Sequence, residues 1–186
     1  MNPRRLALYA EADRKTAGMP AATGLVCPTG CGACCVGAPP HVSVSDVAPI
    51  AAAALASGEA EALLDRALAI GAGPCALFAP GQLPGGCTVY AIRPMVCRLF
   101  AFAAVRDKHD VPELAICREH STADPATRTR VAAYLASEPP PELAYFADLQ
   151  REAHDPDQGS PELLPINVAL AHALERALLR ARYADG

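Results

Sequence analysis

The spacing of apolar and polar residues along the chain predicts a mainly helical fold. In several stretches apolar side chains recur every three or four residues, as they do on the buried face of a helix. The clearest case lies near the C-terminus, where Leu170, Leu174 and Leu178 form one apolar stripe. Glycine or proline marks the ends of most of these stretches. The predicted helices cover residues 4–17, 45–57, 59–70, 124–136, 141–153 and 165–182.

A β-hairpin is expected in the middle of the chain. Residues 99–105 and 114–117 favour extended structure, and the polar residues 106–110 between them suit a turn. Pairing of the two arms would bring Cys97 and Cys117 close together at the open end of the hairpin.

The segments between these predicted helices and the hairpin have weaker secondary-structure patterns. Residues 19–40 are rich in Gly and Pro, which predicts a structured loop without helix or strand. Residues 41–44 and 88–90 favour short extended pieces, the second after a turn at 84–86. Ser45 is the expected cap of the helix that follows, with Asp46 in its first turn.

These elements predict a fold class and a division of the chain. The fold class is mainly α with a small β-hairpin, in a compact single domain organised around a cysteine-rich metal site. The expected cysteine-cluster metal-binding domain covers residues 1–122, and a C-terminal helical extension, residues 123–186, is expected to pack on it.

Composition narrows the possible partners. The chain has 186 residues and a net charge of −4, and it lacks the clustered Lys and Arg that attract phosphate backbones. Nucleic-acid binding is therefore not expected. No stretch reaches the roughly 20 apolar residues of a membrane span, and the charged first 15 residues do not resemble a secretory signal. We expect a cytoplasmic protein with no membrane partner.

The chain contains eight cysteines, whose thiols are its main candidates for metal binding. In a reducing cytoplasm, so many thiols in a short chain indicate metal or redox chemistry, although their even number also fits a disulfide framework. Thiolates bind zinc, Cu(I) and iron–sulfur centres in preference to magnesium or calcium. The predicted metal ligands are Cys27, Cys31, Cys34, Cys35, Cys75, Cys87, Cys97 and Cys117.

The first cysteine block is the segment Cys27-Pro-Thr-Gly-Cys31-Gly-Ala-Cys34-Cys35. Its spacing lets several thiolates reach one ion or one cluster, and Gly30 and Gly32 let backbone N–H groups turn toward sulfur. Because the Cβ directions of adjacent residues are expected to diverge, Cys34 and Cys35 are predicted to serve two different centres. The second block must then complete the ligand set, so Cys31 and Cys97 are predicted to converge on one region.

The second block contains Gly86-Cys87-Thr-Val-Tyr90 and Arg93-Pro94-Met-Val-Cys97-Arg98. Together with Cys75 and the first block, this pattern resembles the YkgJ-like bacterial cysteine-cluster family of zinc- or iron-chelating proteins, which also includes flagellin lysine methylase. The resemblance covers residues 27 to about 102, and Cys117 lies where many members carry a further cysteine. It implies a cysteine-bound metal centre. For the methylase branch, whose members are much longer than this chain, it implies methyl transfer from S-adenosylmethionine assisted by an iron–sulfur centre.

Three other residues of the second block are predicted to bind the cofactor. Arg93 and Arg98 can donate hydrogen bonds to sulfur or to a bound anion, and both are expected to tune the centre or bind an anionic partner rather than hold the fold. Tyr90 can donate its hydroxyl, although packing with only its tip polar is equally expected. His41 and His120 are further candidates that could complete a site of three cysteines and one histidine.

Two functions remain open from the sequence. In the first, the protein is a metal-binding protein that holds zinc or an iron–sulfur cluster in one or two centres, with a metal ion as its partner and a protein partner or substrate not identified. In the second, it is a metal- or iron–sulfur-dependent enzyme of the methyl-transfer type. The CxxxCxxC spacing of radical S-adenosylmethionine enzymes is present, but the chain lacks the alternating strands and helices of their barrel.

Overall fold

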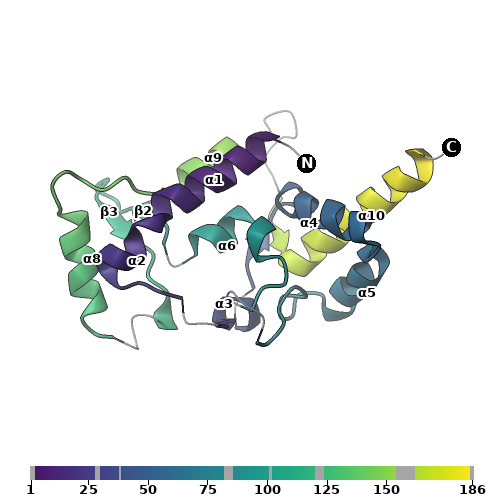
Figure 1. Cartoon of the computed structure of the whole chain (residues 1–186), viewed down its shortest axis with the longest axis horizontal. Helices are drawn as coiled ribbons and strands as arrows, with labels where there is room; N and C mark the ends of the chain where they lie inside the picture. Colours follow the sequence, from purple (N-terminus) through teal and green to yellow (C-terminus); the bar gives the residue numbers. More distant parts are fainter. Residues whose placement is uncertain are drawn as a thin grey trace. The chain divides into compact units, whose positions relative to one another are not determined.

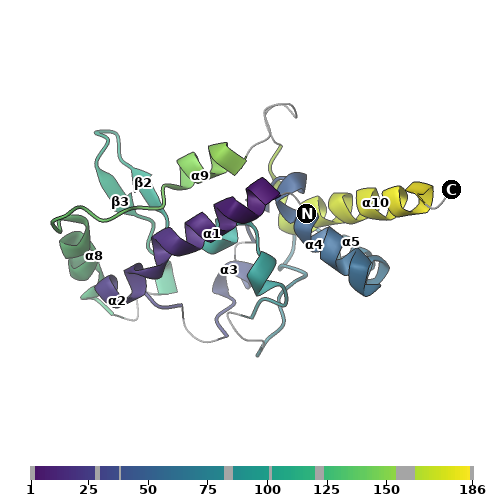
Figure 2. The same cartoon turned by 45° about the horizontal axis from the view of Figure 1, so that its top comes forward.

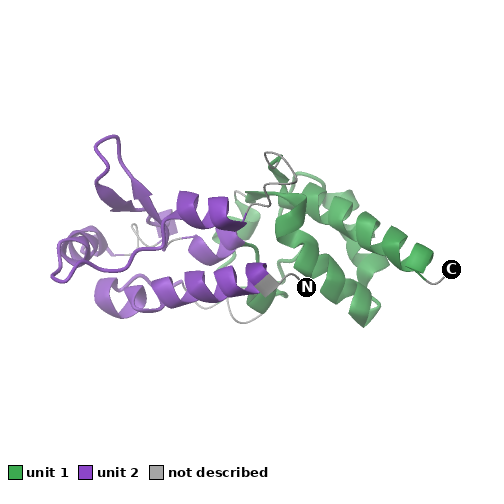
Figure 3. Ribbon diagram, turned by 90° about the horizontal axis from the view of Figure 1, so that it is seen from above, with its two compact units in different colours: residues 1, 29–94, 158–186 green, residues 2–28, 95–157 purple. Residues whose placement is uncertain are grey.

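The computed structural model describes residues 3–27, 30–37, 39–81, 86–100, 102–119, 124–153 and 162–184. These residues group into two compact units, each built from separate parts of the chain (Figure 3). Unit 1 comprises residues 29–94 and 158–186, and unit 2 comprises residues 2–28 and 95–157, with Met1 assigned to unit 1. Neither unit ends at residue 122, and the division into domains at that point stays a prediction.

Unit 1 is built around the C-terminal helix. Helix α10 (Ile166–Ala184) packs along α4 (Val44–Ser57) and α5 (Ala60–Ile70), as Figure 1 shows. The predicted stripe of α10 is buried at Leu170 and Leu174, and Leu178 is half-buried. Strands β1 (His41–Val42) and β4 (Leu164–Pro165) form an antiparallel pair that leads into α4 and α10. The unit also contains α3 (Ala33–Val36) and the 3₁₀ helix η1 (Tyr90–Ile92).

Unit 2 combines helices with one hairpin. Helix α1 (Pro3–Ala17) packs on α6 (Met95–Leu99) and α9 (Phe146–Ala153), and α2 (Met19–Thr23) packs on α8 (Thr127–Leu135). Strands β2 (Ala104–Arg106) and β3 (Pro112–Leu114) pair antiparallel beside α9 (Figure 2). Its two apolar clusters centre on Leu8, Met95 and Leu149, and on Met19, Leu25 and Val131.

The mainly α fold class with a small hairpin is confirmed. No helix in the described ranges is both long and apolar enough to cross a bilayer. The hairpin is shorter than predicted, because residues up to Leu99 are helical and the first strand begins only at Ala104. Helix α9 begins at Phe146 rather than near Pro141, since the carbonyl of Ala144 accepts a hydrogen bond from the N–H of Ala104 beside the hairpin.

Three local predictions are wrong. Residues 19–40 are not all loop, because they contain α2 and α3. Residues 88–90 do not form a strand; Cys87 makes a single antiparallel bridge with Phe78, and a 3₁₀ helix begins at Tyr90. The cap of α4 is Ser43 rather than Ser45, since Ser43 and Asp46 exchange side-chain and backbone hydrogen bonds in a capping box. Residues 84 and 85 of the predicted turn lie outside the described residues.

Candidate metal centre

The short helix α3 carries two of the predicted ligands. The carbonyl of Gly32 accepts hydrogen bonds from the N–H groups of Cys35 and Val36, at 2.8 and 2.9 Å, which closes the helical turn. The Sγ atoms of Cys34 and Cys35 lie 4.0 Å apart. The Cβ directions of consecutive helical residues differ by about 100°, as predicted, but suitable rotamers bring the two sulfurs together. That Cys34 and Cys35 serve two different centres stays a prediction.

Cys75 is held beside this pair by the backbone. Its N–H donates to the carbonyl of Cys35 at 2.8 Å, which joins segments forty residues apart in the chain. The Cys75 side chain is buried, and its thiol interacts with that of Cys35. Cys75 lies in the loop of residues 71–76. Asn167 of α10 holds this loop through hydrogen bonds to four of the loop's backbone groups.

Cys87 is brought in by a short stretch of antiparallel pairing. The N–H of Ala79 donates to the carbonyl of Gly86 at 2.8 Å, and the N–H of Thr88 donates to the carbonyl of Leu77 at 3.0 Å. These bonds connect the chain after Cys75 to the chain around Cys87. Four cysteines from three segments of unit 1 thus form one neighbourhood, which we call the unit 1 thiol cluster: Cys34, Cys35, Cys75 and Cys87.

An aromatic ring lies against two glycines beside the cluster. A Cβ at Gly32 would stand 2.0 Å from Cε2 of Phe78, and a Cβ at Gly86 would stand 2.4 Å from the same atom. The ring of Phe78 therefore occupies the space that side chains at both positions would need. Gly86 also has a φ of +67°, a conformation that other residues adopt at a cost. Both glycines are needed for this packing.

The pKa values of the Cys34 and Cys35 thiols are raised in the cluster. The hydrogen bond with Cys35, then burial, then the charge of Cys35 raise the pKa of Cys34 far above its ordinary value. The hydrogen bond from Cys34 lowers the pKa of Cys35, but its own bond to Cys75, burial, and the charges of Cys75 and Cys87 outweigh this and raise it to about 12. Without a cation these thiols hold their protons, because hydrogen bonding between the thiols, burial and the charge of neighbouring thiolates together disfavour ionisation.

Arg93 supplies positive charge to the cluster. Burial raises the pKa of Cys87, while the N–H of Val89 and the guanidinium of Arg93 oppose that rise. The guanidinium is positioned by Tyr90: it lies over the Tyr90 ring at 3.8 Å from the centroid and donates to the Tyr90 carbonyl at 2.8 Å. Tyr90 thus orients Arg93 through its ring face and its backbone.

The comparison with protein families identifies the chain. Residues 26–126 match the model of the CxxCxxCC family, described as a "Putative zinc- or iron-chelating domain". The chain belongs to this family. The resemblance that the cysteine motifs carry is confirmed. Comparison with curated proteins and with solved structures gave no match. Three residues separate Cys27 from Cys31 here, one more than the family's name spells out.

The remaining four cysteines of this CxxCxxCC domain are divided between the two units. Cys31 is half-buried and belongs to unit 1. Cys27 is exposed, Cys97 and Cys117 are half-buried, and these three belong to unit 2. Cys31 and Cys97 belong to different units, and their convergence stays a prediction. The proximity of Cys97 to Cys117 also stays a prediction.

Arg98 holds the fold of unit 2. Its side chain is 4% exposed, donates to the carboxylate of Asp13 at 2.5 Å and stacks on the ring of Tyr9 at 4.3 Å. These contacts fasten α6 to α1. The expectation that Arg98 does not serve the fold is therefore wrong, while its predicted action on the metal centre stays a prediction.

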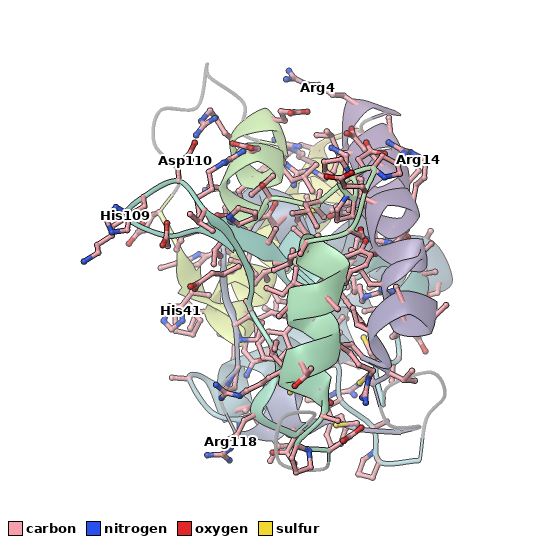
Figure 4. All side chains as sticks on the ribbon, turned by 90° about the vertical axis from the view of Figure 1, so that its left-hand side faces the viewer. Arg4, Arg14, His41, His109, Asp110 and Arg118 are labelled. Carbon is pink, nitrogen blue, oxygen red and sulfur yellow. The ribbon has the colours of Figure 1, made fainter. Side chains whose placement is uncertain are left out.

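The histidines add no ligand that the structure displays. His41 is exposed on β1, and His109 lies in the turn of the hairpin, next to Asp110 at its tip (Figure 4). His120 and His154 lie outside the described residues. Among the side chains that are described, no three His, Cys, Asp or Glu yet converge on one metal-sized position. A bound ion would have to draw the thiols of the cluster inward.

The geometry and protonation of the unit 1 thiol cluster fit a thiophilic metal. Two sulfurs bound to one tetrahedral zinc, at about 2.3 Å each, lie roughly 3.8 Å apart. The 4.0 Å between Cys34 and Cys35 is close to that separation. The raised pKa values fit as well, since a divalent cation removes the repulsion that keeps the protons on the thiols.

Two residues of the site escape the sequence-based prediction. Phe78 carries no motif signal, because an isolated Phe in a loop is most simply explained as core. Asn167 carries a weak one: it is the polar residue at the start of the apolar helix α10, where it is almost fully buried. A buried Asn needs hydrogen-bond partners, and that requirement is the signal that points to a positioning role.

Proposed function

We propose that this CxxCxxCC protein binds one zinc ion through the unit 1 thiol cluster. The observation that carries the proposal is the 4.0 Å separation of the Cys34 and Cys35 sulfurs, together with the interaction of Cys35 with Cys75 and Cys87. Four thiolates complete the tetrahedral shell that zinc prefers at structural sites.

Charge compensation supports this ligand set. Four thiolates around a divalent ion leave a net charge of −2, which a buried site must offset. The guanidinium of Arg93 and the N–H of Val89 both favour the thiolate form of Cys87. The N–H groups of Cys34 and Cys35 do the same for Cys34. The surroundings of the cluster are therefore suited to hold an anionic centre.

A site of this kind supplies folding free energy. When all four positions of zinc are taken by thiolates, none stays open for a substrate, and the binding free energy stabilises the folded chain. In unit 1 the ion would join three segments that are distant in sequence: α3, the loop around Cys75 and the bridge at Cys87. The proposed role of the ion is thus to hold unit 1 together.

We propose the other four cysteines, Cys27, Cys31, Cys97 and Cys117, as further thiol ligands for zinc or for an iron–sulfur cluster, as the sequence predicts. A catalytic role in methyl transfer would belong to these other thiols, because the unit 1 thiol cluster leaves no position open.

Metal analysis of anaerobically purified protein tests the proposal. We expect zinc, without iron or labile sulfide, at the unit 1 thiol cluster, so any brown colour would come from a cluster on the other four thiols. Replacement of the zinc by Co²⁺ should give the intense visible absorption of a tetrahedral thiolate site, and Cys35→Ser should weaken binding strongly. Cys27→Ser serves as the control outside the cluster, and its spectrum at the unit 1 thiol cluster should be unchanged. Equal losses in Cys27→Ser and Cys35→Ser would overturn this assignment of ligands.

A further inference from the structure

We infer that Asn167, on the C-terminal helix and outside the family-matched residues 26–126, is a positioning residue for Cys75. This inference rests on the proposed function, since Cys75 is one of the four proposed ligands. It assigns to α10 a part of the metal centre that the family match does not include.

The side chain of Asn167 organises the loop that carries Cys75. Its Oδ1 accepts the N–H of Ala76 at 2.8 Å, and its Nδ2 donates to the carbonyls of Gly71 and Pro74, both at 2.9 Å, with a longer contact to Gly73 at 3.4 Å. These groups lie on both sides of Cys75 in the chain. One amide thereby fixes the loop before and after the ligand.

Asn167 is a polar residue at a buried position where apolar residues surround it. Asn167 is 1% exposed, in the first turn of an otherwise apolar buried face. An apolar residue there would leave the N–H of Ala76 and two carbonyls without these partners, and each buried unsatisfied group is costly. The pattern of one acceptor and two donors matches the amide of Asn.

The segment that contains Asn167 also holds the chain that follows Cys35. Strand β4, directly before α10, pairs with β1, with Pro165 opposite His41 and Leu164 opposite Val42. The N–H of Ile166 donates to the carbonyl of Pro40 at 3.0 Å. Residues 164–167 therefore contact both the strand after Cys35 and the loop around Cys75. They hold the strand that follows Cys35 and the loop around Cys75 through contacts of the protein alone.

The consequence is preorganisation of the centre. If the loop 71–76 were loose in the metal-free protein, the ion would have to order it on binding, and affinity would fall. Loss of a group that orients a ligand typically lowers metal affinity by roughly 10- to 100-fold. We expect a loss in this range for Asn167→Ala, and a smaller one for Asn167→Ser, whose hydroxyl keeps a polar group beside the loop.

Two measurements test the inference on the full chain. The first is zinc affinity by competition with a chelator. The second is the rate at which iodoacetamide alkylates Cys75 in metal-free folded protein, followed by mass spectrometry. Leu174→Val is the matched control: Leu174 is also buried on α10, about 10 Å farther along the helix axis, and does not hydrogen-bond to the loop. Asn167→Ala should weaken zinc binding and speed alkylation at least tenfold, and Leu174→Val should do neither.

The outcomes separate this inference from the proposed function. If wild-type protein binds zinc and Cys75→Ser does not, but Asn167→Ala behaves like Leu174→Val in both assays, the positioning role is refuted and the zinc site stands. If wild-type protein binds no zinc, the proposed function fails, and alkylation alone decides whether Asn167 positions Cys75. Should Asn167→Ala fail to fold, Asn167→Ser is measured in its place against the same control.

Discussion

Three glycines of unit 1 allow the packing of Phe78 to be measured by single alanine substitutions. Gly32 has an ordinary φ of −121°, but an added Cβ would meet the Phe78 ring at 2.0 Å. Gly58 has a φ of +76° with nothing within 4 Å of an added Cβ. Gly86 combines the two conditions, with a φ of +67° and the ring at 2.4 Å. The set separates steric conflict from backbone strain.

The expected magnitudes follow from these differences. A left-handed conformation costs a non-glycine residue about 1–2 kcal/mol, so Gly58→Ala should lower the free energy of unfolding by that amount. Forcing a methyl group into occupied space costs about 1–3 kcal/mol, which is the expectation for Gly32→Ala. Gly86→Ala should show both effects, about 2–5 kcal/mol in total.

Urea unfolding of metal-free protein measures these values, and Phe78→Ala supplies the double-mutant cycles. With the ring removed, Gly32→Ala should cost little, so the coupling energy of the pair should be about 1–3 kcal/mol. Gly86→Ala should keep only its backbone strain in the same background. Gly58→Ala should cost the same with and without the ring, since it does not touch Phe78.

Additive effects of the Gly32 and Phe78 substitutions would refute this packing of the ring against Gly32. Additivity would mean that the ring does not occupy the space in front of Gly32. If Gly86→Ala lowers the free energy of unfolding no more than Gly58→Ala does, the contact between Phe78 and Gly86 is contradicted as well.

Three further outcomes are expected. Zinc affinity should rise with pH, because all four thiol ligands must lose a proton to bind and the pKa values of Cys34, Cys35 and Cys87 are raised. The logarithm of the affinity should climb by roughly four per pH unit between pH 6 and 8, and a slope near zero in chelator competition would contradict the ligand set. Arg98→Ala should lower the free energy of unfolding by about 1–3 kcal/mol in thermal melts, whereas Arg118→Ala, whose side chain is 88% exposed, should change it little. Cys87→Ser should lower zinc content and melting temperature together, and melts that do not respond to added zinc would count against a structural ion.

The helices of this chain were largely predictable because their signals are local. The apolar stripe with Leu170 and Leu174, and the glycines after residues 57 and 70, are readable from the sequence alone. The exact residues that cap the helices were harder to predict. Ser43 and Ser45 both suit a helix start, and only the capping box with Asp46 distinguishes them.

The candidate site was predictable in its residue types but not in its grouping. The motifs name the eight cysteines, and chemical reasoning names a thiophilic metal. Which thiols meet depends on long-range contacts: the bond from Cys75 to Cys35 and the bridge between Phe78 and Cys87 have no local signature. The contribution of Asn167 depends on how α10 packs, which no motif records.

X-ray absorption at the metal edge of the purified protein tests the central claim most directly, with Cys27→Ser used to isolate the unit 1 thiol cluster. A single zinc ion held by Cys34, Cys35, Cys75 and Cys87 predicts a shell of four sulfurs at about 2.3 Å and no metal–metal distance. The spectrum should be the same in wild-type protein and in Cys27→Ser, and the sulfur count should fall in Cys87→Ser. Iron with a short iron–iron distance in Cys27→Ser, or a sulfur shell that survives Cys87→Ser intact, would contradict the claim.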